Sequence, residues 1–241
     1  MVSRVLKNSI FLRIYAGLVV LVVVVAVFCY LLVQIINYQR AQEYRESLTD
    51  GISYVISEGV ARQPEKQQKL DWISDASDLL ELPIYYVDAA RVELSRTERK
   101  RIAEQKSVVR YDANNGIGYV IIGLKDDPKH FLYIKVDKIG ERQMKALPIF
   151  VLDYLIFYPG QEREYLEKIK KHFYYPIEIA DIRDINLDSE QIGRLRQDQS
   201  VLLYKDSATV RGTTISIVSP MPNHPAQVLV LGPVPMFNWM P

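Results

Sequence analysis

Cysteine is almost absent from this chain of 241 residues, because Cys29 is the only one. It lies inside an apolar run, so the part of the chain that follows has neither a thiol nor a disulfide and depends on its hydrophobic core for stability. A Cys–His catalytic pair is thereby excluded there. Phe28 precedes the cysteine where lipid attachment requires a small residue, which argues against a lipoprotein anchor.

Motifs of catalysis and of metal or phosphate binding are also lacking. The three histidines, His130, His172 and His224, have no second ligand at a metal-site spacing such as H-E-x-x-H. The sequence contains no G-x-S-x-G elbow, and NNGIG at 114–118 is typical of a hairpin turn rather than of a phosphate loop. We therefore predict no catalytic, cofactor-binding or metal-binding residue, and whether the protein is an enzyme stays open.

Neither basic nor acidic residues predominate in this chain. Without the three basic residues that precede the apolar run, the chain has 27 basic and 29 acidic residues, and it lacks the clustered basic face that a nucleic-acid partner requires. Two acidic pairs are interpreted as solvated rather than catalytic: Glu162 with Glu164, and Asp181 with Asp184. A basic cluster is interpreted as a solvated helix face, with an anion or acidic-peptide contact as the alternative: Arg96, Arg99, Lys100, Arg101 and Lys106.

An apolar run of twenty uncharged residues, Ile14–Val33, is the most prominent feature that is present. At the rise of an α-helix it matches the roughly 30 Å hydrocarbon core of a bilayer. Arg4, Lys7 and Arg13 precede it with no acidic residue, so the positive-inside rule places 1–13 in the cytoplasm, 14–36 in the membrane and the rest outside. A cleaved signal peptide is disfavoured, because the run is too long and no A-x-A-like site follows.

A stem at 37–65 follows the membrane segment. Apolar residues recur there at helical spacing, among them Ile52 and Val55, which predicts one long helix that enters the outer part despite Gly51. Two interpretations are compatible: an amphipathic helix packed on a sheet, and a rigid rod that transmits displacement to the membrane. We name Ile52 and Val55 as signal-transmitting residues on this basis.

The outer part contains an internal repeat. Residues 71–87 and 164–180 are each an amphipathic helix that ends just before a proline, Pro83 or Pro176, and continues as a strand. The offset of 93 residues persists to Tyr111 and Tyr204. Each repeat reads as helix, strand, helix and three strands, which predicts an α+β fold of two tandem PAS-like units, each an antiparallel sheet with helices on one face.

The segments between and after the repeats complete the predicted domains. The connector at 140–159 is predicted to be helical, interrupted at Pro148, and to pack in the core, with a partner contact as the alternative. Near the C-terminus, Gly232, Pro233 and Pro235 are expected to stop the sheet and to transmit the signal toward the bilayer. The outer domains are therefore the stem, the first repeat at 66–139, the connector, the second repeat at 160–235, and an approach to a second membrane helix at 236–241.

Five long, irregular segments are distinctive. They read SIFLRIYAGLVVLVVVVAVF, NYQRAQEYRESLTDGISYVISEGVAR, KVDKIGERQMKALPIFVLDYLIFYPG, LDSEQIGRLRQDQSV and VLVLGPVPMFNWMP. In these segments the chain resembles the RstB/BfmS-like family of envelope sensor histidine kinases, over essentially its whole length. The resemblance implies the N-terminal anchor and periplasmic sensor region of such a kinase, in the inner membrane of a Gram-negative bacterium.

The resemblance also implies partners and cofactors. Members of the family are homodimers that autophosphorylate, with ATP and Mg²⁺ in a cytoplasmic kinase domain, and they pass the phosphate to a cognate response regulator. That kinase domain is not part of this sequence, so the expected cofactors of the chain itself are none. A periplasmic ligand or protein is an expected further partner. The alternative function is a single-pass, membrane-anchored periplasmic binding or scaffold protein without kinase activity, and the gene beyond codon 241 distinguishes the two.

Overall fold

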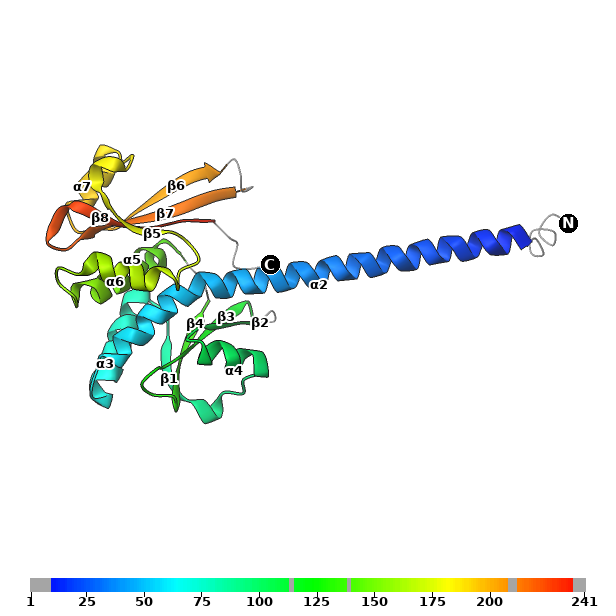
Figure 1. The fold of residues 1–241 in the computed structure, drawn as a ribbon, viewed down its shortest axis with the longest axis horizontal. Coiled ribbons are helices and arrows are strands. Elements are labelled where there is room, and N and C mark those ends of the chain that lie inside the picture. Colours follow the sequence, from blue (N-terminus) through cyan, green and yellow to red (C-terminus); the bar gives the residue numbers. More distant parts are fainter. Residues whose placement is uncertain (1–9, 113–114, 138–139, 208–211, 236–241) are drawn as a thin grey trace. The chain divides into compact units, whose positions relative to one another are not determined.

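The computed structural model describes residues 10–112, 115–137, 140–207 and 212–235. The chain forms an N-terminal unit, Met1–Tyr44, and a C-terminal unit, Arg45–Pro241, and Figure 1 shows the fold. The predictions for 1–9 and for 236–241 lie outside the described residues. The class is α+β, with a long apolar N-terminal helix and two antiparallel four-stranded sheets.

Helix α2 (Ile10–Ala61) forms the described part of the N-terminal unit and continues into the C-terminal unit. It is the one helix among the described residues that is long and apolar enough to cross a membrane. Its side chains from residue 12 to residue 40 are exposed, as the lipid-facing surface of a membrane helix must be. The helix passes through Gly51 without a break, which confirms that anchor segment and stem belong to one helix.

The two sheets have the same topology. The first contains β1 (Ile84–Asp88), β2 (Val108–Asp112), β3 (Ile117–Gly123) and β4 (His130–Val136), in the order β1-β4-β3-β2. The second contains β5 (Ile177–Asp181), β6 (Val201–Ser207), β7 (Gly212–Met221) and β8 (His224–Pro235), in the order β5-β8-β7-β6. Strands β1 and β5 thus occupy equivalent edge positions, which confirms the predicted repeat.

The segments between the first two strands of each sheet are equivalent too. In both repeats an aspartate, Asp88 or Asp181, accepts a hydrogen bond from the backbone of a short 3-10 turn, η1 (Ala89–Arg91) or η2 (Ile182–Asp184). Helices α4 (Arg96–Ala103) and α7 (Ser189–Leu195) follow, each opened by a capping box, Ser95 with Glu98 and Asp188 with Gln191. The local sequence therefore encodes the same turn and helix start twice.

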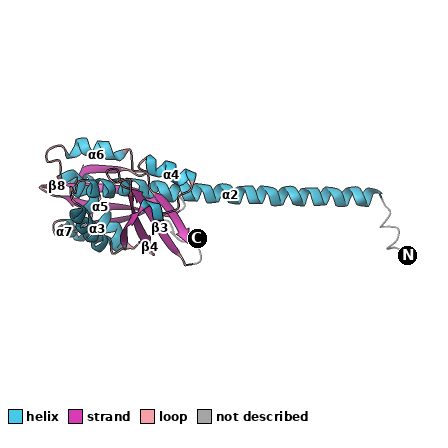
Figure 2. Ribbon diagram, turned by 90° about the horizontal axis from the view of Figure 1, so that it is seen from below, coloured by secondary structure: helices cyan, strands magenta, loops and turns pink. Residues whose placement is uncertain are grey.

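Helices pack on both faces of the sheets, where we expected them on one. In the first sheet Ile121 belongs to a cluster with Ile102 of α4, while its neighbour Val120 points to the opposite face, where it lines a cavity with Ile52 of α2. In the second sheet α7 lies on one side of the strands and α5 (Glu141–Ile156) and α6 (Glu162–Lys170) on the other (Figures 1 and 2). Consecutive apolar residues such as Val120, Ile121 and Ile122 require cover on both faces.

Two further helices lie between stem and sheets. Helix α3 (Lys66–Leu80) opens the first repeat and packs against β1 and α5. Helix α5 continues through Pro148, so the predicted interruption is wrong. Its apolar residues are mostly buried, Phe150, Val151 and Leu155 among them, which confirms core packing and offsets the one hydrogen bond that the proline cannot make.

Strand β8 extends to Pro235, the last residue of the segment from Gly232 to Pro235 where we expected the sheet to stop. The pairing of β8 with β5 ends at Leu231. Pro233 lies beyond this point, so its missing N–H does not remove a hydrogen bond to β5. On its other side Val234 and Pro235 pair with β7 across an irregular register.

Gly232 itself allows this strand to continue. Its backbone N–H donates to the carbonyl of Pro176 at 2.8 Å, and its φ of 113° lies in a region that side chains rarely adopt. A Cβ there would lie 2.7 Å from the carbonyl oxygen of Ile215. The peptide bond from Gly232 to Pro233 is cis.

Candidate functional site

The part of α2 that belongs to the C-terminal unit is buried among both repeats. Ile52 and Val55, the signal-transmitting residues predicted on the stem, expose only 8% and 2% of their surface. The adjacent Ile56, which the sequence analysis did not single out, is equally buried at 2%. This part of the stem is therefore a core element of the C-terminal unit.

A polar cluster joins the stem to the first repeat. We define it as Glu46, Thr49 and Asp50 of α2 with Arg101 of α4 and Ser107 before β2. Arg101 donates from Nη2 to both carboxylate oxygens of Asp50 at 3.1 Å, and its Nε lies 3.1 Å from Oε2 of Glu46. The side chains of Asp50 and Arg101 are only 13% and 20% exposed, so this ion pair is less screened than a surface pair.

Ser107 closes the cluster. Its backbone N–H and its hydroxyl each donate to Oδ1 of Asp50 at 2.9 Å, and its hydroxyl lies 2.7 Å from that of Thr49. Arg101 also donates from Nε to the carbonyl of Ser107 at 2.9 Å. Glu46, Thr49 and Asp50 of the stem therefore each have a partner in the first repeat, which fixes the register of the two parts.

The basic cluster predicted on α4 divides into two kinds of side chain. Arg96, Arg99 and Lys100 are exposed, which agrees with a solvated helix face. Arg101 instead reaches the stem, so the solvated interpretation is wrong for this residue. No local pattern identifies it, because its partner Asp50 is 51 residues away in the sequence.

Aromatic contacts join the stem to the second repeat. Tyr54 stacks on His172 with ring centroids 3.7 Å apart and an interplanar angle of 9°. Burial lowers the pKa of His172, and the positive charge of Lys171 adds to this effect, so the stacked imidazole favours its neutral form. One turn earlier, Gly51 faces Phe173, and a Cβ there would lie 2.5 Å from its ring. The close approach of α2 and this segment requires the glycine.

The C-terminal end of the stem is held by the connector. The guanidinium carbon of Arg62 lies 4.5 Å from the ring centroid of Tyr154 and 4.6 Å from that of Phe157, within the range of cation–π attraction. Arg62 also donates from Nη2 to the carbonyl of Tyr154 at 3.4 Å. The stem is thus in contact with the first repeat, the connector and the second repeat.

The other predicted signal-transmitting residues lie on a different element. Gly232 is buried and Pro233 is exposed on β8, and the side chain of Pro235 lies outside the described residues. The structure therefore does not bring the two predicted sets together in one site. Since the stem contacts both repeats, it does not depend on β8 alone for its connection to the second sheet.

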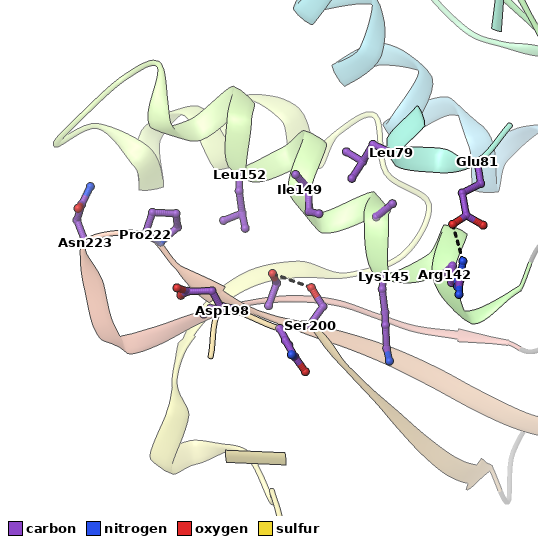
Figure 3. Close-up of a pocket in the computed structure, with 14 residues that line it drawn as sticks. Leu79, Glu81, Arg142, Lys145, Ile149, Leu152, Asp198, Ser200, Pro222 and Asn223 are labelled. Atoms are coloured by element: carbon purple, nitrogen blue, oxygen red, sulfur yellow. Dashed lines mark hydrogen bonds and ion pairs between the residues drawn. The ribbon is translucent and has the colours of Figure 1, made fainter. Parts of the chain in front are cut away.

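A cavity of about 760 Å³ lies between α3, α5 and the second sheet (Figure 3). Ile149 and Leu152 of α5 supply apolar surface on one side. Polar groups line it as well: Arg142 and Glu81 form an ion pair of 2.7 Å, and the hydroxyl of Ser200 donates to that of Ser219 at 3.0 Å. Its volume and mixed lining are typical of small-molecule sites.

The sequence analysis missed this cavity because its walls come from segments far apart in the chain. Leu79 and Glu81 belong to the end of the first repeat's helix, whereas Asp198 and Asn223 come from two loops of the second repeat. In the structure Glu81, Asp198 and Asn223 have positive φ values of 52°, 57° and 64°, which do not by themselves indicate a ligand.

His130 is held in a cluster of a different kind. Its Nδ1 lies 2.9 Å from Asp127, and its ring stacks on that of Tyr86 with centroids 4.3 Å apart. The hydroxyl of Tyr86 donates to the same carboxylate. Burial and this hydrogen bond raise the pKa of Tyr86 to about 12, so the phenol stays protonated at neutral pH. The cluster stabilises the turn between β3 and β4.

Potential metal ligands do not converge in the described part of the chain, where no three His, Cys, Asp or Glu side chains form a group that would hold an ion. Comparison of the sequence with protein-family models finds no match. No curated protein matches the chain either.

Proposed function

We propose that the chain is the periplasmic sensory input module of a two-component sensor histidine kinase. In this proposal α2 anchors the module in the inner membrane of a Gram-negative bacterium, with its N-terminus in the cytoplasm. The C-terminal unit responds to a condition or ligand of the envelope and controls autophosphorylation and phosphotransfer to a response regulator. The sequence resemblance to the RstB/BfmS-like family and the two antiparallel four-stranded sheets support this proposal.

The observation that carries the proposal is the dual character of α2. One and the same helix contains a segment of membrane length and a segment that is buried among both repeats. A plain anchor requires only the first of these. A helix that is also held by Asp50 to the first repeat, by Tyr54 to the second and at its end by the connector moves when those parts move.

The same contacts suggest how a ligand would act. A ligand shifts an equilibrium only through different affinities for two states. The 760 Å³ cavity has walls from the first repeat, the connector and the second repeat, so an occupant would favour one arrangement of these parts. Small shifts of packed helices are an established kind of switching transition, and the stem would transmit such a shift to the membrane.

The family likeness adds partners that the chain alone does not contain. The protein acts as a homodimer in this proposal, and ATP and Mg²⁺ bind to a cytoplasmic kinase domain encoded beyond residue 241. The decisive experiment is to read the gene past codon 241. We expect a second apolar segment, then a linker and a kinase core with a phosphoacceptor histidine. A stop codon at that point contradicts the proposal and favours an anchored binding or scaffold protein.

A further inference from the structure

A second, smaller cavity of about 120 Å³ lies between the stem and the first sheet. Leu48, Ile52 and Ile56 line it from α2, four residues apart and therefore on one face of the helix. Val120 and Ile134 line it from the sheet, where they are direct partners on adjacent strands. The cavity thus lies between an apolar helix face and an apolar sheet face and is partly open to solvent.

Few polar groups line it. Three polar side chains contribute to the wall, Thr49, Ser53 and Gln143. The hydroxyl of Thr49 donates to the carbonyl of Glu46 at 2.9 Å, and the side-chain carbonyl of Gln143 accepts from the backbone of Gly140 at 2.9 Å. The rest of the lining is apolar, which favours an apolar occupant over ordered water.

The size of the cavity is informative because protein interiors are close-packed and leave few voids larger than a water molecule. Dry, apolar cavities of about 150 Å³ bind benzene or xenon in other proteins. We propose that the 120 Å³ cavity is a binding site for a small, uncharged, apolar molecule or group about the size of one benzene ring. A charged group is excluded by the cost of burying it without a partner.

Because the site lies against α2, binding there affects the packing of the stem. An occupant touches Ile52, the residue that the sequence analysis named as signal-transmitting, together with the turns before and after it. Filling the cavity therefore favours the packing of α2 on the first sheet that the structure shows. Binding itself does not require the proposed kinase role, so the site is tested independently of the proposed function.

The experiment uses the full chain in lipid nanodiscs with benzene as the probe. At about five times its dissociation constant, benzene is expected to raise the midpoint of thermal unfolding by about 2–4 °C. Hydrogen exchange of the backbone amides from Leu48 to Ile56 is expected to slow. Val120→Phe places a phenyl ring in the cavity and is expected to abolish both responses.

A matched control accounts for benzene dissolved in the lipid. Val87→Phe introduces the same ring into the same sheet, but Val87 pairs with Phe131, which lies in the cluster facing α4, on the opposite side. This variant should respond to benzene as the parent does. Should Val120→Phe not fold, Val136→Phe fills the cavity from β4 instead. No response in the parent, or the same response in the parent and the filled variants, overturns the proposal.

Discussion

At the scale of single residues, glycines on α2 set how closely the stem approaches its neighbours. Gly51 faces the ring of Phe173 and Gly59 faces that of Trp72, and neither site has room for a Cβ. Both glycines are costly in a helix, and the cost is offset by burying two large aromatic side chains against the backbone. The stem is therefore adapted to close packing at the expense of its own helix propensity.

The substitution Gly51→Ala tests this directly. We expect it to lower the free energy of unfolding by about 1–3 kcal/mol, because the added methyl group forces Phe173 away from α2. Gly193→Ala is the matched control, since Gly193 lies in α7 with nothing within 4 Å of its would-be Cβ. It should raise stability by about 0.5–1 kcal/mol through helix propensity alone. Thermal or denaturant unfolding of both variants measures the change in the free energy of unfolding. We expect opposite signs for the two variants, and changes of the same sign would contradict the close packing at Gly51.

Glu98 contributes to the stability of the fold in a way that depends on pH. Its carboxylate pairs with Arg110 at 2.8 Å and accepts from the backbone of Ser95, and these contacts lower its pKa from 4.5 to about 2, against the opposing effect of burial. Because the folded-state pKa is the lower one, the stabilisation is present above pH 4.5 and is lost as the pH falls toward 2.

Glu98→Gln keeps an oxygen that can accept from Ser95 but removes the charge that pairs with Arg110. We expect the variant to be less stable than the parent at pH 7 and to approach the parent as the pH falls from about 4.5 to about 2. Unfolding curves over this pH range measure the difference. If the difference in the free energy of unfolding between variant and parent stays constant over this pH range, the ion pair of Glu98 with Arg110 does not contribute to stability.

At the scale of elements, the stem contacts both repeats and the connector. Its buried face carries Ile52 and Val55, and its polar face carries Asp50 in the ion pair with Arg101. Such a helix adopts a new position only when apolar packing and polar pairing change together. This coupling is the physical basis for a helix with a few discrete packings rather than a continuously mobile one.

Charge placed on the buried face should disturb that packing. We expect Ile52→Asp and Val55→Asp in the full-length protein to change phosphorylation of the response regulator several-fold without abolishing membrane insertion, because an unpaired buried carboxylate costs several kcal/mol. Ser74→Asp adds the same charge to an exposed position of α3 and serves as the control. Phosphotransfer assays on isolated membranes provide the measurement. If both folded, inserted stem variants signal as the parent does, the stem is only a tether.

Local patterns were sufficient to predict most elements, and long-range contacts were not predictable. Pro83 and Pro176 marked two equivalent helix-to-strand junctions, because a proline restricts the residue before it. The continuation of α5 through Pro148 was missed, because tertiary packing decides that case. The pairing of Asp50 with Arg101 and both cavities depend on residues brought together only by the fold.

At the scale of the whole molecule, the account depends on movement of the stem relative to the first repeat. The hydroxyls of Thr49 and Ser107 lie 2.7 Å apart across that junction, so cysteines at the two positions are close enough for a disulfide. The chain has one other cysteine, Cys29, within the apolar run, and the proposed periplasmic location would favour disulfide formation. A covalent bond at this point would prevent the movement without removing any part of the protein.

The most direct test is therefore the double variant Thr49→Cys with Ser107→Cys in the full-length protein, with each single variant as a control. Phosphorylation of the response regulator is measured in membranes before and after reduction of the disulfide. We predict that oxidation holds phosphorylation of the response regulator by the double variant at one level, and that reduction restores the range of phosphorylation seen in the parent. Neither treatment should change phosphorylation by the single variants. Equal output from the oxidised and the reduced double variant would contradict transmission through the stem.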